Sequence, residues 1–172
     1  MDDGPPRVAI VFDGAGGEEG RAAAVRIADR AVHRGDLEAD LLDLAEAALP
    51  EAADPCAGPV PCAVGDLAPW LADADAFAVV TAGDDLPAGL RDAVGWCADT
   101  WRDKPIALVV AGDRTDAVRA GALLRSLPVG PVVMTASLHG GTATDRWCED
   151  TADRLLDHLL RRVLRPRRPR TP

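Results

Sequence analysis

Apolar residues gather in five short runs along the chain. Three of them, residues 7–12, 76–80 and 106–111, are almost continuously apolar, which is typical of strands covered on both faces. Residues 132–136 form a similar run, and residues 37–44 begin with a period-two alternation of Leu and Ala against acids, which predicts an edge strand. The pattern therefore predicts five strands.

Helical periodicity fills most of the intervals between these runs. Pro87 is predicted to open the central helix, because proline is favoured at a first helical position. In the helix that follows the fourth strand we expect Val118, Ala122 and Leu123 to face inward. Four prolines make residues 45–66 an irregular excursion. The five predicted helices cover residues 18–34, 67–74, 87–101, 116–126 and 145–164.

Strands and helices thus alternate along the whole chain. Such alternation predicts an α/β fold with a parallel sheet, helices on both faces and right-handed crossovers. Residues 1–164 are predicted to form one domain, and the Arg- and Pro-rich residues 165–172 a flexible tail. Ligands of such sheets bind beyond the carboxyl ends of the strands. The turns at 13–17, 82–85 and 112–115 should therefore meet at one crevice.

Charge and composition restrict the partners. The net charge is −9, and the last twelve residues hold six Arg and no acid, so the rest of the chain carries −15. Such a surface repels nucleic acid and anionic membranes. No leader-like start and no apolar stretch of about 20 residues are present, so we expect a cytoplasmic protein without membrane contact. The four cysteines are then expected to be reduced, either as small half-buried thiols or with Cys56 and Cys62 as a redox pair.

A motif around the central helix carries a family resemblance. Ala74-Asp75 precedes the third strand, residues 87–96 read Pro-Ala-Gly-Leu-Arg-Asp-Ala-Val-Gly-Trp, and Lys104-Pro105 precedes the fourth strand. In kind and spacing these segments resemble the NAD(P)H-dependent FMN reductase family, over roughly residues 7–135 of this chain. The resemblance implies a flavodoxin-like three-layer sandwich with strand order 2-1-3-4-5.

The same resemblance implies a function and a set of cofactor contacts. It implies FMN and NAD(P)H as cofactors, reduction of a small molecule such as a quinone or a flavin, and a homodimer. No metal site is predicted beside these cofactors. Glycines in the turns would let the backbone approach the cofactor. The residues implied to contact the cofactor are Gly14, Gly16, Gly17, Arg21, Gly83, Gly112 and Asp113.

The ligand loops depart from the family pattern. Asp13, Glu18 and Glu19 stand in a first loop that has no Ser or Thr, whereas members hold the flavin phosphate there with hydroxyls, an Arg and backbone amides. Residues 82–85 read Ala-Gly-Asp-Asp and lack the aromatic and amide side chains that contact the flavin ring in members. Gly and Asp are also ordinary turn formers.

Two other functions therefore stay open. In a flavin-free relative, Asp84, Asp85 and His139 would perform acid–base chemistry in an acidic crevice, with Asp13 and Asp113 beside them or with a hard divalent cation. In a non-catalytic partner protein, the scaffold would be kept for assembly alone, because a fold does not fix a function.

Overall fold

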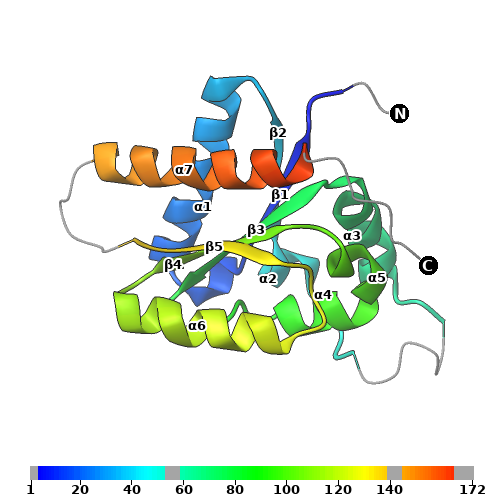
Figure 1. Ribbon diagram of the computed structural model, residues 1–172. Helices are drawn as coiled ribbons and strands as arrows, with labels where there is room; N and C mark the ends of the chain where they lie inside the picture. The colour runs from blue at the N-terminus through cyan, green and yellow to red at the C-terminus, as the bar shows by residue number, and fades with distance from the viewer. Residues whose placement is uncertain (1–3, 53–58, 139–144, 165–172) are drawn as a thin grey trace, which may run out of the picture.

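The computed structural model describes residues 4–52, 59–138 and 145–164, with the backbone alone over 145–148. Five parallel strands form one sheet in the order β2-β1-β3-β4-β5 (Figure 1). The predicted parallel sheet and its 2-1-3-4-5 order are therefore confirmed. The strands are β1 (Arg7–Phe12), β2 (Glu38–Asp43), β3 (Ala76–Ala82), β4 (Ile106–Ala111) and β5 (Val132–Leu138).

Helices cover both faces of the sheet, which makes a three-layer sandwich (Figure 1). One face is covered by α1 (Glu18–Arg34) and α7 (Asp145–Val163). The opposite face is covered by the remaining helices, which are α2 (Leu44–Ala47), α3 (Cys62–Asp73), α4 (Leu90–Trp96), α5 (Ala98–Arg102) and α6 (Arg114–Ser126).

The alternation of side chains along each strand divides the core into two clusters. Val8 and Ile10 of β1 pack under α1 and α7, whereas Ala9 and Val11 face the other helices. The three central strands are buried throughout, apart from their ends, as their continuous apolar sequence predicts. β2 lies at an edge and is only partly covered, which agrees with its alternating pattern.

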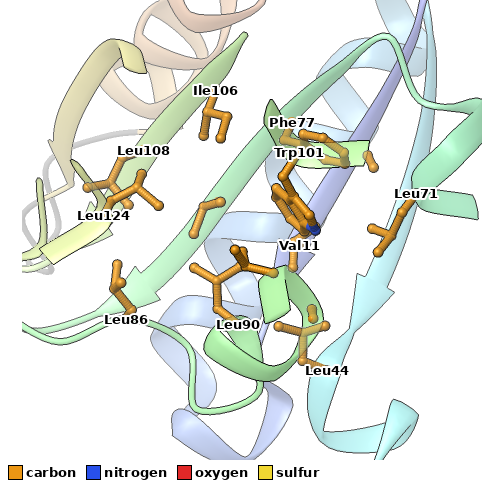
Figure 2. Packing of buried hydrophobic residues seen from close by; sticks show 14 of the residues in the cluster. Val11, Leu44, Leu71, Phe77, Leu86, Leu90, Trp101, Ile106, Leu108 and Leu124 are labelled. Atoms are coloured by element: carbon orange, nitrogen blue, oxygen red, sulfur yellow. The ribbon is translucent and has the colours of Figure 1, made fainter. Parts of the chain in front are cut away.

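An aromatic pair anchors the second cluster (Figure 2). The rings of Phe77 on β3 and Trp101 on α5 are stacked, with centroids 4.0 Å apart, and both side chains are fully buried. Lys104 Nζ lies 5.5 Å from the Phe77 centroid and donates to the carbonyls of Leu71 and Ala72 at the end of α3. This lysine therefore joins the end of α3 to the aromatic core.

Two helices, α1 and α7, lie where the sequence predicts them. The first helix spans the predicted residues, and its buried side includes Ala24, Ile27 and Ala31. It ends at Gly35, whose φ of 67° is left-handed and whose N–H donates to the Ala31 carbonyl. α7 lies within the predicted range 145–164, and its leucines at 155, 156, 159 and 160 are all buried.

The helices before and after β3 begin at other residues than predicted. The helix before β3 begins at Cys62, five residues before the predicted start, because Pro61 serves as its N-cap and accepts from the N–H groups of Val64 and Gly65. Pro87 opens a turn and not the helix: its carbonyl accepts from Leu90 N–H, and α4 begins only at Leu90. The helix then breaks at Cys97, where φ is −119° and ψ is 35°, and α5 follows.

The buried face of α6 differs from the prediction at Val118 and Ala122, whereas Leu123 is partly buried against the core as predicted. The helix begins at Arg114, two residues earlier than expected, because Asp113 caps it. Val118 is 65% exposed, and Ala122 also faces solvent. The face against the sheet is built from the smaller residues Ala117, Ala120 and Gly121 together with Leu124. The strands β3 and β5 each run two residues further than predicted, to Ala82 and Leu138.

Candidate functional site

The loops at the carboxyl ends of the strands meet as predicted. Ala88 N–H, after β3, donates to Asp13 Oδ2, after β1, at 3.3 Å. Gly83 N–H donates to the Ala111 carbonyl at 3.1 Å, and Gly112 N–H donates to the Leu138 carbonyl at 3.0 Å. These bonds join the ends of β1, β3, β4 and β5 into one continuous rim, which we call the crevice rim.

Carboxylates hold the loop after β1. Asp13 is followed by the short 3-10 helix η1 (Gly14–Gly16). Gly14 N–H donates to Asp43 Oδ1 at 2.8 Å, and Ala15 N–H donates to Asp13 Oδ1 at 2.9 Å. Gly16 N–H donates to the Asp13 carbonyl at 3.1 Å. All three amides of η1 therefore already have acceptors within the chain.

The amino end of α1 is open by comparison. Its N-cap is Gly17, with a φ of 115°, and no side chain caps it. No atom lies within 4 Å of the position that a Gly17 Cβ would take. Glu18 and Glu19 occupy the first turn and are exposed. Arg21 is exposed and makes no ion pair within the described part of the chain.

The loop after β3 is held mainly by its own polar groups. Thr81 Oγ1 donates to the Asp85 carbonyl at 2.7 Å, and the Asp85 carboxylate accepts from Leu86 N–H at 2.7 Å. Gly83 has a φ of 75°, and the space that its Cβ would take is open. The left-handed backbone thus accounts for glycine at this position, and the space beside it belongs to the crevice rim.

An ion pair links this loop to α6. Asp84 Oδ2 lies 3.0 Å from Arg119 Nη1, with both side chains more than half exposed. Such an exposed pair contributes about 0–1 kcal/mol to stability. Its main effect is positional, because it holds the 83–85 loop against α6 at the edge of the rim.

The loop after β4 is a capping box. Asp113 Oδ1 accepts from the N–H groups of Thr115 and Asp116, and Asp116 Oδ2 accepts from Asp113 N–H. A Gly112 Cβ would lie 2.6 Å from Asp116 Oδ2, so this glycine makes room for the capping carboxylate. Gly112 and Asp113 thus have a local structural role, and a cofactor contact by either residue stays a prediction.

The structure brings together most of the residues predicted for the site, and it adds two. Gly14, Gly17, Gly83, Asp84 and Gly112 all lie on or beside the crevice rim, whereas His139 lies outside the described residues. Asp43 and Arg119 were not predicted. Asp43 was detectable, because it ends the strand beside β1 and parallel strands end at one edge.

The described residues outside the crevice rim give little support for a metal site or a reactive thiol. Among the described residues, no three His, Cys, Asp or Glu side chains gather in a way that would hold a metal ion. Burial raises the pKa of the Cys97 thiol, which disfavours a reactive thiolate, and Cys56 lies outside the described residues. No described helix is long and apolar enough to cross a bilayer.

One open hollow lies at the other end of the sheet. Its volume is about 450 Å³, and it lies where β5 starts and α7 ends, whereas the crevice rim lies at the carboxyl ends of the strands. The hollow is therefore separate from the rim. It is lined by Pro131, Val132, Val133, His158, Arg161 and Arg162.

Solved structures share the fold. FerB from Paracoccus denitrificans, a flavoenzyme NAD(P)H:(acceptor) oxidoreductase, is 17% identical with a TM-score of 0.67, over 91% of this chain and 98% of that one. An azoreductase from Bacillus anthracis is 15% identical with a TM-score of 0.58, over 92% and 97% of the two chains. The apo NADH:FMN oxidoreductase EmoB is 13% identical with a TM-score of 0.66, over 96% and 92%. No curated protein sequence gave a significant match.

The sequence itself matches a family model. The model describes NADPH-dependent FMN reductases and matches residues 11–145, which include the end of β1, all of β2 to β5 and every loop of the crevice rim. FMN with a nicotinamide nucleotide as electron donor is the cofactor pair of this family, and flavin-dependent reduction is its general activity. This protein belongs to the NADPH-dependent FMN reductase family.

Proposed function

We propose that this protein is an NAD(P)H-dependent reductase that uses FMN to reduce a small organic acceptor such as a quinone, a flavin or a pathway intermediate. The observation that supports this proposal is the crevice rim. Hydrogen bonds join the loops after β1, β3 and β4 at the edge of the sheet where such folds bind their ligands.

In this proposal the flavin ring and its ribityl chain contact the backbone of the described residues. Gly17 and Gly83 are glycines with positive φ and with open space at the Cβ position, which allows close approach of a flat ligand. Gly112, by contrast, makes room for Asp116. In this proposal Gly17 and Gly83 contact the cofactor, and Asp84 with Arg119 fixes the edge of the site.

The chain contributes position and electrostatics. Bound FMN would supply the redox chemistry, because it accepts a hydride from NAD(P)H and passes the electrons to an acceptor. The rim would hold the flavin beside the donor, and the Asp84–Arg119 pair would limit the movement of the loop at 83–85.

Thermal unfolding with added ligand tests binding. A ligand that binds only the native state raises the melting temperature, so excess FMN should stabilise the full-length chain. Oxidation of NADH and NADPH with a panel of quinones, flavins and azo compounds should then identify the donor and the acceptor. No stabilisation by any flavin, together with no nicotinamide oxidation, would contradict the proposal.

The acid–base alternative has a separate test. Asp84 is paired with Arg119, and Asp85 caps its own turn, so the described geometry gives both carboxylates local contacts. Replacing the carboxylate outside this ion pair, as Asp85→Asn, keeps an acceptor for Leu86 N–H and should leave nicotinamide oxidation within about threefold of the parent. Loss of a flavin-independent reaction in this variant would favour the acid–base alternative.

Assembly and location remain predictions. The family resemblance implies a homodimer, and light scattering of the purified chain would measure its mass. Trp70 on α3 is 50% exposed, whereas the fully buried Trp101 belongs to the core. Trp70 is therefore more available to an interface than Trp101. Fractionation of cells would test the cytoplasmic location.

A further inference from the structure

The phosphate end of the site carries an unusual set of contacts. A glycine-rich loop before a helix normally offers free N–H groups to a phosphate. In this chain the three N–H groups of η1 donate to the Asp43 carboxylate, the Asp13 carboxylate and the Asp13 carbonyl. The protein itself therefore supplies the hydrogen-bond acceptors that a bound phosphate would otherwise supply to this loop.

Asp43 is fixed firmly in this position. The same Oδ1 that accepts from Gly14 N–H also accepts from Ala45 N–H at 3.0 Å and caps α2. A Cβ on Gly14 would collide with the Asp43 carboxylate, so the glycine and the carboxylate fit each other. A phosphate that replaced this carboxylate would uncap α2 and would take away the acceptor of Gly14 N–H.

The remaining charges near this loop are mostly negative. Asp13 lies in the loop, Asp43 contacts the loop from the end of β2, and Glu18 and Glu19 lie in the first turn of α1. Arg21 is the cation that follows them on α1. A phosphate dianion at the open first turn would therefore meet more carboxylates than cations.

We infer that the flavin phosphate contributes little to binding, so that the site accepts riboflavin about as well as FMN. This inference rests on the proposed function, and it names unphosphorylated flavins as cofactors that the same site accepts. The ring and the ribityl chain carry the affinity through the backbone at Gly17 and Gly83. Acceptors within the protein, mainly the carboxylates of Asp13 and Asp43, already take the N–H groups of η1, and the open first turn of α1 carries Glu18 and Glu19.

Titration of flavin fluorescence with the full-length protein tests this inference, with riboflavin and FMN as the two probes. We expect the two dissociation constants to agree within about threefold. Raising the salt concentration should leave riboflavin binding unchanged and should leave FMN binding unchanged or stronger, because salt screens repulsion.

Asp43→Asn is the informative variant. The amide oxygen is still able to accept from Gly14 and Ala45, while the negative charge is removed. FMN binding should strengthen on the order of tenfold and riboflavin binding should not change. Asp99→Asn is the matched control, because Asp99 is an exposed acid on α5, which precedes β4 at the opposite end of the sheet, and it should change neither constant.

Of the following three results, the first and the third would overturn the inference, and the second would overturn its explanation through Asp43. FMN that binds at least about 30-fold more tightly than riboflavin, and loses affinity in salt, would overturn it and leave the proposed function intact. If the dissociation constants of riboflavin and FMN are equal and Asp43→Asn changes neither, then Asp43 does not weaken FMN binding. Failure of both flavins to bind would overturn the proposed function as well. The salt dependence of the parent protein decides the question if the variant does not fold.

Discussion

The carboxylate of Asp43, at the end of β2, accepts a hydrogen bond from Gly14 N–H at 2.8 Å, just beyond the end of β1. Asp43 also pairs in register with Phe12, so the contact joins two neighbouring strands where they enter the crevice rim. An edge strand that is only partly covered is thereby tied to the centre of the sheet.

The fit between Gly14 and Asp43 predicts different effects for two nearby glycines. Gly14→Ala should lower the free energy of unfolding by about 1–2 kcal/mol, because the new Cβ displaces the Asp43 carboxylate from its hydrogen bonds. Gly16→Ala should change it by less than about 0.5 kcal/mol, because the nearest atoms lie 3.8 Å from its Cβ position. Urea unfolding measures both, and equal effects would contradict the prediction.

Gly83 is expected to resist substitution for a different reason. Its φ of 75° is left-handed, so Gly83→Ala should cost about 1–2 kcal/mol even though the space around it is open. Gly65→Ala is the matched control. Gly65 lies inside α3 with open space around it, so the substitution should stabilise the protein by about 0.5–1 kcal/mol. A neutral Gly83→Ala would contradict the assigned backbone.

The stacked aromatic pair predicts a contrast between two tryptophans. Trp101→Ala should cost about 3–5 kcal/mol, because the indole is fully buried against Phe77. Trp70→Ala should cost less than about 1 kcal/mol, because half of that side chain is exposed. Denaturant unfolding of the two variants gives the comparison, and a similar loss in both would contradict the assignment of Trp101 to the core.

The contact between α1 and α7 predicts a dependence on pH. Arg30 Nη2 lies 2.7 Å from Asp153 Oδ2, and Arg34 Nη2 lies 2.8 Å from Asp157 Oδ1. The hydrogen bond and the charge of Arg30, with Arg34 nearby, hold the pKa of Asp153 below its usual value. A lowered folded-state pKa stabilises the protein above the unfolded pKa of about 3.9, and this stabilisation is lost as the pH falls through the folded pKa.

Asp153→Asn tests this ion pair. At pH 7 the variant should unfold about 2–4 °C below the parent, because about 1 kcal/mol of pairing is lost. The difference should shrink as the pH falls below about 3.9, where the parent carboxylate also takes up a proton. A difference that stays constant down to pH ~2.5 would show that the pair is not the cause.

The sheet was predictable because its signal is local. Continuous apolar runs such as Arg7–Phe12 and Ile106–Ala111 mark buried strands without any knowledge of their neighbours. The turns after these strands were predictable as one crevice, because parallel strands place their carboxyl ends together. The order of the strands, in contrast, came from the family resemblance.

Features that depend on distant partners were missed or misplaced. Asp43 reads as an ordinary turn acid until β2 is placed beside β1, and Arg119 has a role only through Asp84, which is 35 residues away. On α6, small residues and not the larger Val118 face the sheet, since the capping box at Asp113 sets where the helix begins. Local periodicity alone contains neither constraint.

Anaerobic spectrophotometry of the full-length protein with flavin tests the central claim most directly. NADPH or NADH added to protein with excess FMN or riboflavin should bleach the flavin absorbance at about 450 nm, at a rate proportional to protein concentration. Bleaching with at least one donor is the result that a flavin-dependent reductase requires. No protein-dependent bleaching with either donor and either flavin would contradict the account.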